Sequence, residues 1–165
     1  MDKETRPNER RLKRIVLAYM PVAIGGAVAT FAYDVGAHPG SGARDDIVFR
    51  GSPLVPPLFM PIVLLGASYP AAKRGPVGLV ATAVIGLVGV GFVGGTTFNL
   101  PNDLDAARAA GSPVWAPYLV AAIHLPLGVA LASQSFFALR QRRLRARPAA
   151  LPTDRLRGTK TRSAM

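Results

Sequence analysis

The sequence predicts an all-α fold, an integral membrane bundle of four transmembrane helices with both chain termini in the cytoplasm. Half of the 165 residues are hydrophobic, yet the chain carries a formal net charge of +11. The charges are not spread evenly, because uncharged residues form four blocks, 15–33, 51–72, 75–102 and 109–139. A stretch of about 18 or more apolar residues is typical of a membrane-crossing helix, since about 20 residues span a hydrocarbon core of roughly 30 Å.

Aromatic residues set the expected ends of these spans, because Trp and Tyr prefer the headgroup level of a bilayer. Tyr33 closes the first block, Tyr69 lies near the end of the second, and Trp115 opens the fourth. We therefore divide the chain into a basic segment 1–14, a membrane domain 15–139 and a basic, largely disordered tail 140–165. The four spans are expected at 15–33, 54–72, 76–98 and 115–139.

The basic residues predict the orientation of the chain. Seventeen of the twenty Lys and Arg residues lie before the first span, between the second and third, or after the fourth. The other two loops hold Arg44, Arg50 and Arg108 together with five aspartates. Cytoplasmic loops accumulate Lys and Arg, so both termini are expected in the cytoplasm. Arg outnumbers Lys by 16 to 4, which is typical of GC-rich genomes, and we expect a multi-pass protein of the bacterial cytoplasmic membrane.

The first span has an alternative interpretation as a secretory signal peptide. A basic segment, an apolar stretch and Ala27-Val28-Ala29 together resemble a signal with a small-residue cleavage site. The apolar residues continue to Tyr33, which is longer than the usual apolar region of about 7–15 residues. We favour a retained span, and cleavage stays open as the alternative.

Small residues predict how the helices pack. Gly91 and Gly95 form a GxxxG pair in the third span, and Gly86 belongs to a second row of small residues. In the fourth span, Gly128 lies in a stripe of small residues. Small side chains let helix backbones approach closely in lipid, so these four glycines are the expected packing positions, within one chain or between two copies.

Two positions inside the predicted spans are candidates for function, a histidine and a proline that is expected to bend its helix. His124 is the one ionisable residue within a predicted span apart from tyrosines, and such a residue is a functional-site candidate by default. The alternative is a neutral imidazole that only hydrogen-bonds across the bundle. Pro61 is expected inside the second span, where a missing amide bends the helix. A fixed kink that helps packing is the favoured interpretation, and a hinge is the alternative.

The chain lacks the groups that most membrane enzymes need. It has no cysteine and two histidines, so thiol chemistry and a histidine-rich metal site are excluded within one chain. His38, Asp45 and Asp46 share an outer loop without a recognised metal-ligand spacing. In the other outer loop, Asn102 is expected to begin a separate small helix. We assign no catalytic, cofactor-binding or metal-ligating residue, and we favour a non-enzymatic protein, with an intramembrane enzyme as the least favoured alternative.

These observations leave two functions open. The favoured one is an accessory or structural membrane subunit that packs against partner helices, because polar groups inside the bundle are nearly absent. The alternative is a small oligomeric permease or channel with a path near His124 and Pro61, which requires a water-filled cavity lined by the histidine. The expected partners are the lipid bilayer, anionic headgroups at the basic tail, and a second copy or another membrane protein. We expect no nucleic-acid binding, because the tail has no aromatic residue for stacking.

Overall fold

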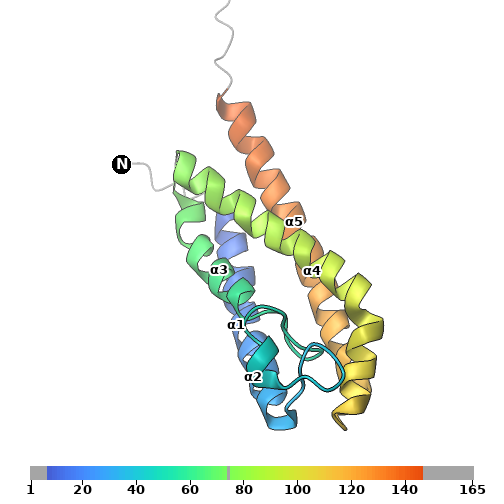
Figure 1. Ribbon diagram of the computed structural model, residues 1–165. Helices are drawn as coiled ribbons and strands as arrows, with labels where there is room; N and C mark the ends of the chain where they lie inside the picture. Colours follow the sequence, from blue (N-terminus) through green and yellow to red (C-terminus); the bar gives the residue numbers. More distant parts are fainter. Residues whose placement is uncertain (1–6, 74, 147–165) are drawn as a thin grey trace, which may run out of the picture.

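A computed structural model describes residues 7–73 and 75–146, which form an all-α structure without strands in those ranges (Figure 1). The helices are α1 (Pro7–Tyr33), α2 (Ala43–Asp46), α3 (Phe59–Ser68), α4 (Pro76–Ala109) and α5 (Trp115–Ala146), with a short 3-10 turn, η1 (Pro70–Ala72), after α3. The predicted all-α class is therefore confirmed.

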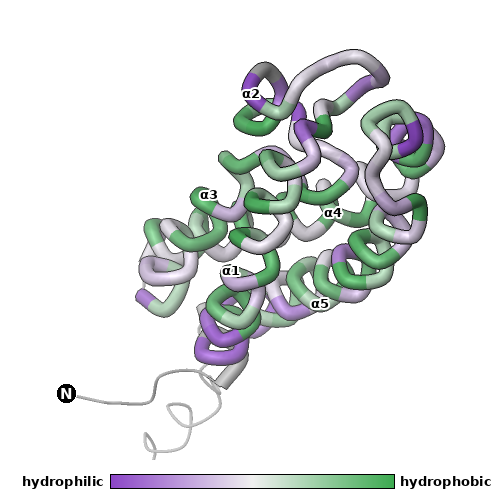
Figure 2. The backbone as a smooth tube through the Cα atoms, turned by 90° about the horizontal axis from the view of Figure 1, so that it is seen from below, coloured by the Kyte–Doolittle hydropathy of each residue, from purple (hydrophilic) through white to green (hydrophobic). Residues whose placement is uncertain are grey.

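Three helices, α1, α4 and α5, are long and apolar enough to cross a membrane, and the helical segment Phe59–Ala72 is a fourth, shorter apolar element. Large apolar side chains on their outer faces are exposed, including Ile24, Leu87 and Phe98. Figure 2 shows the hydrophobic colouring along these helices, with hydrophilic residues gathered at α2 and near the start of α1. An apolar exterior of this kind suits contact with lipid.

Successive long elements run in opposite directions, so each end of the bundle gathers its own set of termini and loops (Figure 1). One end, here the basic end, holds the start of α1, η1, the start of α4 and the end of α5. At this end Arg142 donates to the Ala71 carbonyl over 2.6 Å, and the Lys13 ammonium lies 4.1 Å from the centre of the Tyr69 ring. The opposite end, here the loop end, holds α2 and the connections 34–58 and 110–114.

The second predicted span differs most from expectation. Its helix begins at Phe59 and not near residue 54, because the prolines at 53, 56 and 57 keep the preceding chain non-helical. Pro61 therefore lies in the first turn, where a missing amide costs nothing. The bend expected at Pro61 was wrong for this reason.

The segment 51–58 reaches the core in a non-helical form and packs on α1. Its Leu54 carbonyl touches Gly26 of α1 so closely that a β-carbon there would clash. The Ser52 hydroxyl lies 2.6 Å from the Thr30 hydroxyl, and Ser52 and Val55 exchange backbone hydrogen bonds of 2.8 and 3.2 Å. Pro53 and Val55 of this segment are buried, and burial in protein is a condition under which non-helical backbone can persist inside a membrane.

The third predicted span continues beyond its expected end at residue 98. α4 has 34 residues, or about 51 Å at 1.5 Å per residue, so it is longer than a hydrocarbon core of roughly 30 Å is thick. The helix passes through Pro101, and the separate helix expected at Asn102 is part of α4. It ends before Gly111, whose positive φ of 67° lets its amide bond back to the Arg108 carbonyl.

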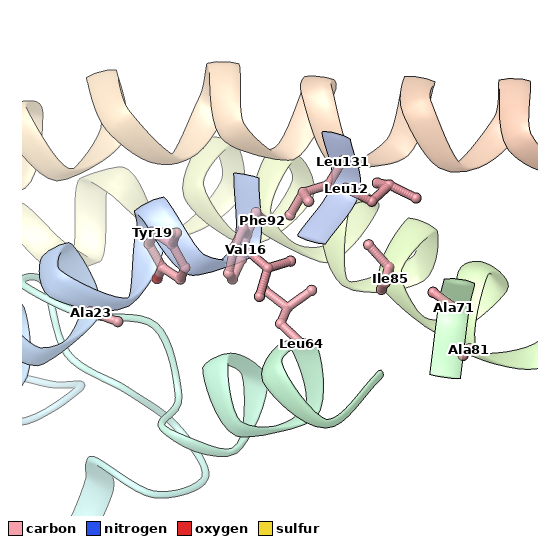
Figure 3. Close-up of a cluster of buried hydrophobic side chains, with 10 residues drawn as sticks. All are labelled: Leu12, Val16, Tyr19, Ala23, Leu64, Ala71, Ala81, Ile85, Phe92 and Leu131. Atoms are coloured by element: carbon pink, nitrogen blue, oxygen red, sulfur yellow. The ribbon is translucent and has the colours of Figure 1, made fainter. Parts of the chain in front are cut away.

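Ten buried side chains form the apolar core between the helices (Figure 3). They follow one another from Ala23 and Tyr19 to Ala71 and Ala81 at the basic end. Leu12, Leu64, Ile85 and Leu131 have no exposed surface, so no water-sized space borders these four side chains.

Candidate functional site, a polar vestibule that ends at His124

His124 on α5 is buried and hydrogen-bonded across the bundle. Its Nε2 lies 2.9 Å from the hydroxyl of Tyr19 on α1, a residue 105 positions earlier in the chain. Only 5% of His124 and 3% of Tyr19 are exposed. The Tyr19 hydroxyl and Nε2 of His124 therefore satisfy each other's hydrogen-bonding capacity at a buried position.

The hydrogen-bond pattern fixes what His124 can offer a ligand. A phenol is the stronger donor of the two in a neutral pair, so we assign the Tyr19 hydroxyl as donor to Nε2 and place the imidazole proton on Nδ1. Among the described residues no hydrogen bond to Nδ1 is found, and this nitrogen is not sealed from solvent. Nδ1 is thus free to donate to a bound molecule.

Phe92 of α4 completes an aromatic cluster with this pair. Its ring centre lies 5.5 Å from that of Tyr19 and 5.3 Å from that of His124, and the Tyr19 and His124 rings are 5.6 Å apart in an edge-to-face arrangement. Offset aromatic contacts at this spacing are favourable. Phe92 and His124 form the floor of a cavity, and Tyr19, which does not line that cavity, packs against both rings.

A cavity of about 380 Å³ opens above this floor toward the loop end. We call it the vestibule. Polar side chains from the loops, α4 and α5 line part of it: His38, Arg50, Ser52, Thr96, Asn99, Asn102, Asp103 and His124. A pocket of this size with a few convergent polar groups is typical of a small-molecule site.

The α4 wall of the vestibule becomes more polar from the floor to the rim. Phe92, Thr96, Asn99 and Asp103 recur at spacings of three and four residues, so they share one face of the helix. Gly91 and Gly95 lie beside this row and also line the cavity. Their missing side chains provide the width of the vestibule.

The non-helical segment forms the opposite wall. Arg50, Ser52, Val55, Pro56 and Pro57 all line the cavity. The first amides of α3 are already occupied, since Leu58 and Phe59 donate to the carbonyls of Ile47 and Val48, over 2.9 and 3.4 Å. This wall therefore contributes side chains and carbonyls to the vestibule and no free helix N-terminus.

The buried carboxylate of Asp46 holds the rim in place. It accepts the Ala37 amide over 2.9 Å and an ion pair from Arg50 over 3.3 Å. Hydrogen bonding from Ser41 and Ala37 lowers the pKa of Asp46, with Arg50 acting in the same direction against burial. Arg50 at the rim is thus already paired with a carboxylate.

The structure separates the four glycines of interest into two groups. Gly128 of α5 meets Gly89 of α4, where a β-carbon on Gly128 would lie 2.7 Å from the Gly89 carbonyl, and Gly86 faces Ser135 in the same seam. Gly91 and Gly95 do not touch α5 and border the vestibule instead. A β-carbon added at Gly91 would meet one atom from outside its own stretch of helix within 4 Å, the Met60 methyl at 3.8 Å.

The remaining candidates lie apart from the vestibule floor. Pro61 borders a separate, wholly apolar groove between α1 and α3. The Asp46 carboxylate already binds the Ala37 amide and Arg50. The described residues contain no group of three metal-ligating side chains. Most of the basic tail, from residue 147 onward, falls outside the described residues.

Sequence reasoning missed Tyr19, Thr96, Asn99 and Asp103. The spacing of the last three relative to Phe92 carries a usable signal, because it makes one polar face at the end of an otherwise apolar helix. Tyr19 had no such signal, since its link to His124 exists only in the folded bundle.

No protein-family model, curated protein or solved structure matches this chain.

Proposed function

We propose that this chain is a small four-crossing membrane protein that admits polar solutes from its outer face into the vestibule and passes them across the membrane. The observation that carries the proposal is the polar cavity that ends at the buried His124–Tyr19 pair. A cavity lined by this histidine is what separates a permease from a purely structural subunit, because a packing role requires no polar space inside the bundle.

The broken second crossing supports the same proposal. Many transporters place their substrate sites where a membrane helix is interrupted and non-helical backbone faces a cavity. Here the segment 51–58 precedes the short helix α3 and forms one wall of the vestibule. Passage to the basic end requires Leu12, Val16 and Leu131 to separate, because these side chains close the bundle beyond the floor.

The proposed topology places the loop end outside and both termini in the cytoplasm of a bacterial cell. The distribution of Lys and Arg supports this orientation. An epitope tag at either terminus should be protected from external protease, whereas a tag after Arg108 should be cleaved. Cleavage at the termini with protection of the loop would reverse the orientation.

A solute-flux measurement tests the function. Protein in liposomes should accelerate the entry of at least one of glycerol, choline and methanesulfonate over protein-free liposomes. Gly95→Leu should abolish that entry, because Gly95 lines the vestibule and an added β-carbon there has no atom within 4 Å, so a larger side chain can fill the cavity. Gly94→Leu is the matched control, since Gly94 also has free space around it but does not line the cavity.

Folded protein that gives no flux above that of empty liposomes would contradict the permease function. Flux that survives Gly95→Leu would place the path elsewhere. Circular dichroism and gel filtration of both variants establish that they fold.

An accessory subunit is the second candidate, favoured by one specific observation. The groove between α1 and α3 has a volume of about 360 Å³ and is lined by apolar residues alone, among them Ala23, Ala27 and Ile62. Small residues at such a surface allow a partner helix to approach. Purification from native membranes under mild detergent should then recover a stoichiometric membrane partner or a second copy.

The basic tail is proposed to bind anionic lipid headgroups, as its net positive charge favours. Deleting residues 148–165 should reduce binding to vesicles that contain phosphatidylglycerol. It should leave solute entry through the vestibule unchanged.

A further inference from the structure

We infer that the vestibule selects cationic solutes and that Asp103 at its rim is the residue that makes this selection. This inference rests on the proposed function and deepens it, because it names the substrate class as small organic cations. It follows from the balance of charges in the lining and from the chemistry of the floor.

The lining contains two charged side chains of opposite sign, but they are not equivalent. Arg50 is paired with Asp46 and its side chain is 66% exposed. Asp103 is half-buried and has no ion-pair partner among the described residues. The uncompensated charge in the vestibule is therefore negative.

Asp103 lies in the last two turns of α4, beyond the expected end of the third span at residue 98. Burial raises the pKa of its carboxyl to about 6, because no nearby cation offsets the loss of water. The carboxyl is therefore mostly ionised at neutral pH, and a bound cation would stabilise its charged form. A single charge in a cleft with apolar walls concentrates ions of opposite sign.

The rest of the vestibule is compatible with a cation of moderate size. Asn99 and Thr96, one and two turns below Asp103, provide neutral oxygens along the α4 wall. The Phe92 ring at the floor can accept a cation on its face, and Nδ1 of His124 can donate to a hydroxyl or carbonyl of the same solute. Neither the floor nor the α4 wall presents a fixed positive charge to repel it.

The cysteine-free sequence allows a direct test with one reporter thiol. Thr96→Cys places it inside the vestibule, seven residues or about 10 Å from Asp103 along α4. The full chain in lipid nanodiscs is treated with two methanethiosulfonate reagents of similar size, one with a trimethylammonium group and one with a sulfonate. Each rate is divided by the rate of the same reagent with a simple thiol in solution.

The normalised rate of the cationic reagent should exceed that of the anionic one. Adding Asp103→Asn should reduce this preference by roughly threefold to tenfold, as expected for one charge at about 10 Å with partial screening. Asp105→Asn is the matched control, because Asp105 lies two residues away, pairs with Arg108 over 2.9 Å and does not line the cavity. It should leave most of the preference intact.

The pH dependence gives a second readout that needs no change at Asp103. Between pH 7.5 and 5 the carboxyl becomes protonated, so the cation preference should fall. The other titratable or charged groups that face this space are His38 and Arg50 from the loop and His124 from α5, while Arg108 lies on the same helix. Any pH dependence that remains with Asp103→Asn measures their contribution.

The outcomes separate the two proposals. A thiol at position 96 that reacts with both reagents, at a ratio unchanged by Asp103→Asn, overturns the inference and leaves the open vestibule in place. A preference lost equally with Asp105→Asn also overturns it, because the effect would then be general surface charge. A thiol that reacts with neither reagent overturns the proposed function and this inference together.

Discussion

The two halves of this bundle share the same long helices but differ inside: the loop half holds a polar cavity and the basic half is filled by apolar side chains. At the loop end, Gly91 and Gly95 of α4 and Ala121 of α5 border a polar cavity. At the basic end, the same helices meet along Gly86, Gly89 and Ser135, and apolar side chains fill the space. The difference shows that glycine serves two purposes in one helix, close packing on one face and open space on another.

The aromatic cluster marks the border between these halves. His124 and Phe92 line the vestibule, while Phe92 and Tyr19 also belong to the buried apolar core. The Tyr19–His124 hydrogen bond therefore joins the polar half to the dry half. Changes on either side of this border should have different consequences.

The largest expected effect is on the packed half. Gly128→Leu places a side chain where Gly89 and Val93 already lie within 3 Å of an added β-carbon. We expect a loss of about 3 kcal/mol or more, or failure to fold, because overpacked contacts force the helices apart. Thermal unfolding in detergent measures it.

Gly94→Leu provides the comparison for that change, since an added β-carbon there meets no atom within 4 Å. Its unfolding temperature should remain close to that of the parent protein. Equal destabilisation by both substitutions would show that the α4–α5 seam is not the packed interface.

A smaller effect is expected at the border. Tyr19→Phe removes the hydroxyl that bonds His124 and leaves Nε2 of a buried imidazole without its partner. The expected cost is about 1–2 kcal/mol, because an unsatisfied buried polar group loses its solvation. Thermal unfolding should show it, and a variant as stable as the parent would mean that water replaces the hydroxyl and that the floor is wetter than described.

The smallest expected effect is at the rim. Asp46→Asn removes the charge that holds the Ala37 amide and Arg50 in place, at a cost of about 1 kcal/mol near neutral pH. The pKa of Asp46 is lower in the folded chain than its ordinary 3.8. Its contribution is therefore complete above that value and is lost as the pH falls through the lower, folded-state pKa.

Unfolding measured from pH 6 down to pH 2.5 checks the rim prediction. The parent protein should lose stability below about pH 4, and the Asp46→Asn variant should lose less over the same interval. Identical pH profiles would show that Asp46 does not organise the loop.

The apolar blocks predicted the helical elements well, because long uncharged runs leave few alternatives in lipid. They failed where local chemistry decided the outcome: the prolines before residue 58 delayed the start of α3, and Pro101 did not end α4. At the site, His124 stood out as the histidine inside an apolar run. The partner Tyr19 and the cavity face of Gly91 and Gly95 depend on how distant segments pack, which no spacing along the chain encodes.

The central claim is that the loop half holds an open vestibule and the basic half is dry, and two single cysteines on the same helix test it. Ala121→Cys lies in the vestibule wall, whereas Ala138→Cys is buried toward the basic end. In nanodiscs, where both faces are accessible, a membrane-impermeant thiol reagent should label position 121 and leave position 138 unmodified until the protein is denatured. Equal labelling of the two positions, or faster labelling at 138, would contradict the account.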